Sequence, residues 1–164
     1  MSSAASGAQR HEGALENLPE ELRHRRQWVN WRYEERNDKM TKVPYTPGTR
    51  HRASCTDLEE WGSFEDAIGA LDTGRFDGVG FMLSSGDPYT FIDLDECRNA
   101  ITGEIGEEAQ EIIDALDGYA EVSPSGRGIH IFVRGKVPGS KGRKRGWLEV
   151  YSWERYATMT GVPL

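Results

Sequence analysis

Apolar and polar residues alternate along several short segments of this chain, and such alternation predicts β-strands. The segments are residues 27–33, 41–45, 77–83, 89–94, 120–123, 129–133, 147–151 and 156–160. A polar turn separates the first two segments, so we expect them to pair as a hairpin, with Pro44 at an edge or a strand end. The last two segments are expected to form a final hairpin in the same way.

Three other segments are predicted to be helices, namely residues 18–26, 57–71 and 107–116. The last two place their apolar residues at helical spacing. The first has a proline and acidic residues near its start, and Thr56 or Asp57 is expected to cap the second. Strands and helices in this order predict an α+β fold, in which helices back a largely antiparallel sheet.

The length of 164 residues is typical of one domain, and 37% hydrophobic residues favour a folded core. We expect residues 1–16 to be a disordered tail and residues 17–164 to be the folded domain. No apolar run approaches the ~20 residues of a membrane span, so a soluble, cytoplasmic protein without a membrane partner is expected. Cys55 and Cys97 match no zinc spacing and are expected to be ordinary thiols.

The net charge is −7, but acidic and basic residues are segregated along the chain. Residues 104–121 carry seven acidic side chains and no basic one, and we expect them to form a solvated acidic face. Residues 134–145 are predicted to be a basic loop that contacts DNA phosphates, although an ordinary solvated loop is the alternative. Its basic residues are Arg134, Lys136, Lys141, Arg143, Lys144 and Arg145.

Three carboxylates are candidate metal ligands. Asp93 and Asp95 lie two residues apart on a predicted strand, so their side chains share a face, roughly 6–7 Å apart. Hard oxygen ligands suit Mg²⁺ or Mn²⁺. A solvent-facing strand end is the commoner explanation for such a pair taken alone. Glu149, between two apolar residues, would alone be an exposed edge-strand residue, and it becomes a candidate only as a third carboxylate beside the pair.

A glycine-rich turn at residues 123–130 is a candidate phosphate site. Its glycines permit a tight turn whose backbone N–H groups can face an anion, and Ser125, Gly126 and Arg127 could contact phosphate oxygens. His130, on the strand that follows, could reach a triphosphate, but a half-buried strand histidine is the ordinary alternative. Lys42 and Arg155 are weaker candidates, since a solvated lysine and a turn arginine are as common.

The ordered set of motifs resembles the archaeo-eukaryotic primase superfamily. The matching segments read FIDLD at residues 91–95, SGRGIH at residues 125–130 and LEVY at residues 148–151. The segments at residues 27–29, 41–45 and 155–161 are more narrowly similar to phage and plasmid primase-polymerases. The resemblance covers about residues 20–161, and the ordered set with its flanks is more specific than any one motif.

The resemblance implies an RRM-like catalytic core that adds NTPs or dNTPs to a primer on a single-stranded DNA template. It assigns two divalent ions, Mg²⁺ or Mn²⁺, to Asp93, Asp95 and Glu149. It assigns the triphosphate to the turn and its neighbours, namely Ser125, Gly126, Arg127, His130, Lys42 and Arg155. Relatives of this kind often continue into helical and helicase regions, so we expect this chain to lack that extension and to have a replicative helicase among its partners.

Two other functions remain open at this point. The first is a catalytically incomplete module that binds nucleotides or nucleic acid. The second is a metal-dependent nuclease or replication initiator, because the same carboxylate chemistry hydrolyses phosphodiesters. The SGRGIH turn favours a triphosphate substrate over hydrolysis, and the sequence shows no Tyr with a His-His pair of the nicking type.

Overall fold

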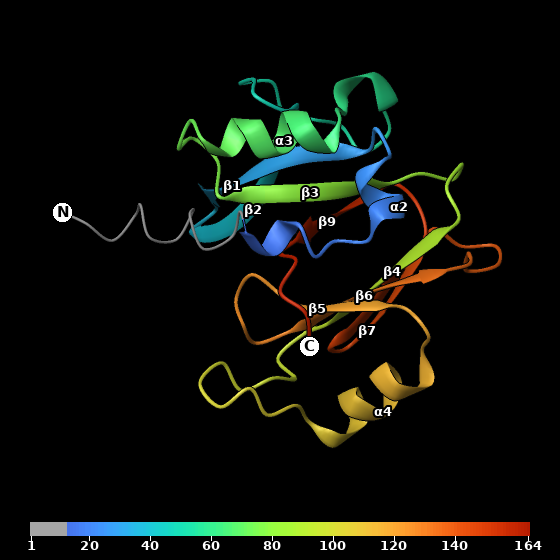
Figure 1. Cartoon of the computed structure of the whole chain (residues 1–164). Coiled ribbons are helices and arrows are strands. Elements are labelled where there is room, and N and C mark those ends of the chain that lie inside the picture. The colour runs from blue at the N-terminus through green and yellow to red at the C-terminus, as the bar shows by residue number, and fades with distance from the viewer. Residues whose placement is uncertain (1–12) are drawn as a thin grey trace. The chain divides into compact units, whose positions relative to one another are not determined.

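The computed structural model describes residues 13–164, which form two compact units. The first unit contains the described chain up to Met82 together with Tyr156–Gly161, and the second contains Leu83–Arg155 with Val162–Leu164. Each unit has its own β-sheet (Figure 1). Most of the predicted tail, residues 1–12, lies outside the described residues.

The sheet of the first unit has the strand order β2-β1-β3-β9. Its strands are β1 (Trp28–Arg36), β2 (Lys39–Tyr45), β3 (Gly78–Leu83) and β9 (Arg155–Met159). The predicted hairpin of β1 and β2 is confirmed, with Arg36 opposite Lys39. Asn37 and Asp38 form the two-residue turn, and both have the positive φ that such hairpins require. Pro44 lies near the end of an edge strand, as predicted.

The helices of the first unit are shorter than the pattern predicts. In the predicted segments they are α2 (Glu20–Arg23), the 3₁₀ helix η1 (Leu58–Glu60) and α3 (Phe64–Leu71). Residues 13–15, within the predicted tail, are helical as well, and Leu15 is buried. The prediction of one helix over residues 57–71 is wrong, because Gly62 exchanges backbone hydrogen bonds with Trp28 and is thereby held extended. Asp57 caps only η1, and Ser63 caps α3 by accepting from the backbone N–H of Asp66.

The sheet of the second unit has the strand order β5-β6-β4-β8-β7. Its strands are β4 (Tyr89–Leu94), β5 (Tyr119–Val122), β6 (Ile129–Arg134), β7 (Gly142–Arg145) and β8 (Leu148–Tyr151). All four pairings are antiparallel. The predicted acidic helix is present as α4 (Glu107–Ala115), and it packs on one face of this sheet against the core that contains Ile92, Leu94, Ile129 and Ile131 (Figure 1).

The predicted final hairpin is wrong. β8 pairs with β4 and with β7, whereas β9 belongs to the other sheet, beside β3. The true partner β7 lies inside the predicted basic loop, and a two-residue turn at Gly146 and Trp147 joins β7 to β8. The α+β class with antiparallel pairing is confirmed, but two sheets stand where the pattern predicted one.

Two further expectations concern membranes and cysteines. Within residues 13–164, no helix has both the length and the apolar character that a bilayer crossing needs. Cys55 and Cys97 are half-buried free thiols, as expected. Trp28, Trp31 and Trp61 are buried in the first unit and form part of its core.

Candidate active site

A row of ionisable side chains crosses the sheet of the second unit, one from each strand. Residues directly opposite each other in neighbouring strands project from the same face. The row therefore lies on one face of the sheet, and this face is opposite to the one that packs on α4, because the row alternates with the core residues Ile92 and Ile131. In strand order the row is Glu121, His130, Asp93, Glu149 and Lys144.

His130 lies near the middle of this row, between two carboxylates. Its side chain is buried, with the residue only 4% exposed. Its Nδ1 lies 3.3 Å from Glu121 Oε1, and its Nε2 lies 3.7 Å from Asp93 Oδ1. The ring of Phe91 contacts the imidazole edge-on. The histidine is thus more deeply buried than a half-buried strand residue, and both of its ring nitrogens face acids.

Glu121 is a site residue that the sequence analysis missed. It was placed on a solvated acidic face, but its exposed fraction is 0%. The hydroxyl of Tyr119 donates to Glu121 Oε2 at 2.8 Å. Burial, and then the charge of Glu121, raise the pKa of Tyr119, so the hydroxyl stays protonated as a donor. The available signal was the alternation of Tyr119 and Glu121 with apolar Ala120 and Val122, which is typical of a strand.

Glu149 is buried and held by cations. Its residue is 6% exposed, so the alternative of an exposed edge-strand glutamate is wrong. Lys144 Nζ lies 2.6 Å from Oε1, the hydroxyl of Tyr151 donates to Oε2 at 2.7 Å, and Arg155 Nη2 lies 3.6 Å from Oε2. Burial acts to raise the pKa of Glu149, but the hydrogen bonds from Lys144 and Tyr151 outweigh it and lower the pKa. Glu149 is therefore ionised at neutral pH.

The predicted metal ligands can be compared with this geometry. Asp93 and Glu149 are directly opposite each other, a position in which Cβ atoms are about 4.5–5.5 Å apart. Asp95 follows the end of β4 and is exposed. The pKa of Lys144 is raised mainly by its hydrogen bond with Glu149 and by the charge of Glu149. The charge of Asp95 raises it to a smaller extent, so Asp95 lies near Lys144. Within residues 13–164, no three acidic, histidine or cysteine side chains are arranged around a common metal position. The carboxylate chemistry fits Mg²⁺ or Mn²⁺, whereas the side-chain conformations leave Glu149 paired with Lys144.

The glycine-rich turn is as tight as predicted, but its backbone N–H groups do not face outward. Gly126 has φ of +76° and donates its N–H to the carbonyl of Ser123. The N–H of Arg127 donates to Ser125 Oγ, and that of Gly128 donates to Ser123 Oγ. These donors are used within the turn, so the expectation that they face an anion is wrong. The exposed side chains of Ser125 and Arg127 remain, and Arg127 pairs with Glu96 at 2.6 Å.

The two weaker candidates lie in different places. Arg155 is part of the site, because its guanidinium lies 4.4 Å from the centre of the Tyr151 ring, beside Glu149. Lys42 belongs to the first unit, where its Nζ lies 5.8 Å from the centre of the Trp31 ring. The structure therefore brings together Asp93, His130, Glu149 and Arg155 in the second unit. Lys42 lies in the first unit.

The six predicted DNA-contacting residues do not form a single surface. Lys136 Nζ donates to the carbonyl of Ser84, to Asp87 Oδ1 and to the carbonyl of Ser152, so it ties loops of the second unit together. Register places Lys144 on the face of the acidic row, and it places Arg143 and Arg145 on the opposite face. The other two, Arg134 and Lys141, contact the Tyr89 ring and Glu154, respectively.

Comparison of the sequence with known protein families finds no family model that matches it. A DNA primase-polymerase of Nitratiruptor phage NrS-1 is 38% identical over 140 residues, which is 82% of this chain and 19% of that protein. The chain is similar to one part of a phage DNA primase-polymerase. This match supports the primase-polymerase side of the predicted resemblance, and the chain spans about a fifth of the length of that relative.

Proposed function

We propose that this chain carries the nucleotidyl-transfer site of a DNA primase-polymerase. The reaction adds NTPs or dNTPs to a strand paired with a single-stranded DNA template. The observation that carries the proposal is the register of Asp93 opposite Glu149, in the segments whose motifs resemble the primase superfamily. The similarity to a protein named as a DNA primase-polymerase supports the same conclusion.

In this proposal Asp93, Asp95 and Glu149 hold two divalent ions, Mg²⁺ or Mn²⁺. Such ions, when bound, help to activate a primer hydroxyl and offset negative charge at the α-phosphate. The chain's own cations have a second role. Lys144 and Arg155 neutralise Glu149 in the structure, and both side chains are exposed enough to exchange that carboxylate for phosphate oxygens.

His130 is positioned for the triphosphate in the same scheme. Its ring is held by Glu121 on one side and approaches Asp93 on the other, so its orientation is fixed before any ligand arrives. The exposed side chains of Ser125 and Arg127 contribute from the turn that precedes its strand, and Gly126, with its positive φ, permits that turn. A single-stranded template with its primer, the incoming nucleotide and a replicative helicase are the proposed partners. The net charge of −7 predicts weak DNA affinity that falls further with salt.

Primer extension tests the proposal. A labelled primer on a single-stranded template is incubated with NTPs or dNTPs and with Mg²⁺ or Mn²⁺. Asp93→Asn and Glu149→Gln are expected to reduce extension at least about 100-fold, because each replaces an anionic metal ligand with a neutral, weaker one. Asp117→Asn and Glu111→Gln are the matched controls, since both residues are exposed in the same unit. Circular dichroism checks that all four variants fold.

A second readout separates chemistry from binding. Mn²⁺ binding is measured by electron paramagnetic resonance on the same variants, without nucleotides. Loss of Mn²⁺ binding in Asp93→Asn and Glu149→Gln, with the controls unchanged, supports the metal site even if the chain alone does not extend primers. That combination would favour the catalytically incomplete module. Cleavage of DNA without nucleotides would favour the nuclease, and absence of both extension and Mn²⁺ binding would contradict the proposed site.

A further inference from the structure

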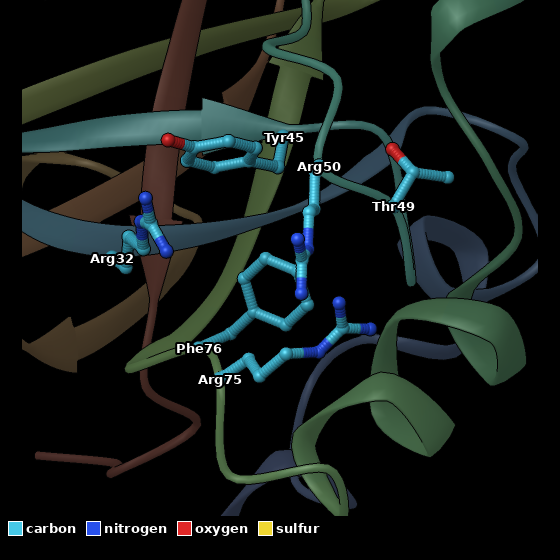
Figure 2. A pocket seen from close by; sticks show the side chains of 6 residues that line it. All are labelled: Arg32, Tyr45, Thr49, Arg50, Arg75 and Phe76. Carbon is cyan, nitrogen blue, oxygen red and sulfur yellow. The ribbon is translucent and has the colours of Figure 1, made fainter.

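The first unit contains a cavity of about 270 Å³ whose lining is rich in arginine. Three segments supply the six lining residues. The β1–β2 hairpin supplies Arg32 and Tyr45, the loop after β2 supplies Thr49 and Arg50, and the loop between α3 and β3 supplies Arg75 and Phe76. Figure 2 shows the guanidinium groups of Arg50 and Arg75 extending into the space beside the Phe76 ring. Three chain segments thus place cationic side chains around one small cavity.

Two of the three guanidinium groups lack an acidic partner. Arg32 is neutralised by Glu34, at 3.2 Å between Nη2 and Oε1. Arg50 and Arg75 make no ion pair with any residue of the described part of the chain, 13–164. Like charges that share a concave surface repel each other, and a bound anion would offset this repulsion. The charge of the cavity therefore favours an anionic ligand.

The cavity is also organised before any ligand binds. Arg75 Nη2 donates to the carbonyl of Gly48 at 3.2 Å, and its guanidinium lies 5.6 Å from the centre of the Phe76 ring. The backbone N–H of Gly48 in turn donates to Oδ1 of Asn30, a fully buried side chain. A guanidinium fixed in this way loses little freedom when it binds, so less of the binding free energy is spent on ordering it.

The size and lining of the cavity define the chemical class of the ligand. Pockets for drug-sized molecules occupy about 300–1,000 Å³, so this cavity suits a smaller group. Tyr45 and Phe76 are only 4% and 7% exposed, so a ligand would meet guanidinium groups more than ring faces. The planar guanidinium matches the oxygens of a phosphate in a bidentate arrangement. We propose that this cavity binds a phosphate group, supplied by a polynucleotide backbone or by a free nucleotide.

Binding measurements on the full chain test this proposal. Fluorescence anisotropy of a labelled oligo-dT strand and calorimetry with dATP are carried out in EDTA, which removes any contribution of metal at the acidic row. The variants are Arg50→Gln, Arg75→Gln and the double variant. Arg36→Gln is the control, because Arg36 is an exposed arginine of the same unit. Within residues 13–164 the Arg50 side chain makes no hydrogen bond that its replacement would break, so Arg50→Gln also serves if Arg75→Gln proves unstable.

The two sources of phosphate give different results. If the backbone of single-stranded DNA is the ligand, each variant weakens oligo-dT binding about fivefold to tenfold. The slope of log affinity against log salt then decreases in magnitude by about 0.7 per arginine, and Arg36→Gln leaves both quantities unchanged. If a free nucleotide is the ligand, dATP binding weakens and oligo-dT binding does not. Losses no larger than that of Arg36→Gln with both probes would overturn the proposal. The result is independent of the proposed function, which concerns residues of the other unit.

Discussion

Replacement of Glu121 tests whether a buried carboxylate holds the middle of the ionisable row. Glu121 accepts a hydrogen bond from the Tyr119 hydroxyl, and its other oxygen lies 3.3 Å from Nδ1 of His130. Glu121→Gln preserves the size of the side chain but removes its charge. It also replaces one oxygen with an amide nitrogen, so the side chain can no longer accept hydrogen bonds from Tyr119 and His130 at the same time.

The magnitude follows from the hydrogen bonds. A bond to a charged group contributes about 1.5–3 kcal/mol and a neutral bond about 0.5–1.5 kcal/mol. We therefore expect Glu121→Gln to lower the free energy of unfolding by about 1–2 kcal/mol. Glu121→Ala leaves buried polar partners unsatisfied and is expected to cost about 3–5 kcal/mol. In a chain of this size, each kcal/mol lowers the melting temperature by about 2–4 °C.

Thermal unfolding followed by circular dichroism measures these changes. The control is Glu111→Gln, an exposed glutamate on α4, which should stay within about 0.5 kcal/mol of the parent. A spectrophotometric titration of tyrosine adds a local readout, because loss of the Glu121 charge should lower the raised pKa of Tyr119. The reasoning is refuted if Glu121→Gln is as stable as Glu111→Gln and the tyrosine titration is unchanged.

Three further predictions concern stability elsewhere in the chain. The hydrogen bond from His51, and then that from the Ser54 backbone, lower the pKa of Glu60. The contribution of Glu60 to stability is therefore present above the ordinary glutamate pKa of about 4.3, and it is lost as pH falls through the lowered pKa. Glu60→Gln should accordingly melt below the parent at neutral pH, with the difference disappearing in acid, whereas Glu59→Gln should show no such trend. Gly161 and Gly139 both have positive φ, but a Cβ on Gly161 would lie 2.1 Å from the Ala14 carbonyl oxygen and one on Gly139 would meet nothing within 4 Å. Urea unfolding should show that Gly139→Ala costs about 1 kcal/mol and Gly161→Ala about 1–3 kcal/mol more, and equal losses would contradict the steric argument. Lys136→Gln should cost about 1–3 kcal/mol because its ammonium ties Ser84, Asp87 and Ser152 together, while the exposed Lys141→Gln should be neutral in the same assay.

Local patterns predicted most of the individual strands. The alternation in residues 27–33 and 41–45 and the polar turn between them specified the β1–β2 hairpin, because all of its signals lie within a few residues of one another. The helix over residues 57–71 failed for the opposite reason. Its apolar spacing is helical, but Gly62 pairs with the backbone of Trp28, which is distant in sequence. A tertiary hydrogen bond overrode a weak local preference.

The candidate site was predicted in part. The motifs identified Asp93, His130 and Glu149 as residues of three strands, and the structure places these strands next to one another. Glu121 was missed, because an acid at the end of an acidic window is usually solvated, and only the pairing of β5 with β6 shows that it faces His130.

The sequence by itself determined where most of the strands and the helix α4 lie, and which face of each of these segments is apolar. These properties depend on the period of side-chain direction within one segment, which is two residues in a strand and 3.6 in a helix. Only the tertiary structure decided that β8 pairs with β4 and β7 and that β9 joins the other sheet. Alternation fixes which face of a strand is apolar but does not specify its neighbour, because any strand with a similar apolar face can supply the backbone hydrogen bonds.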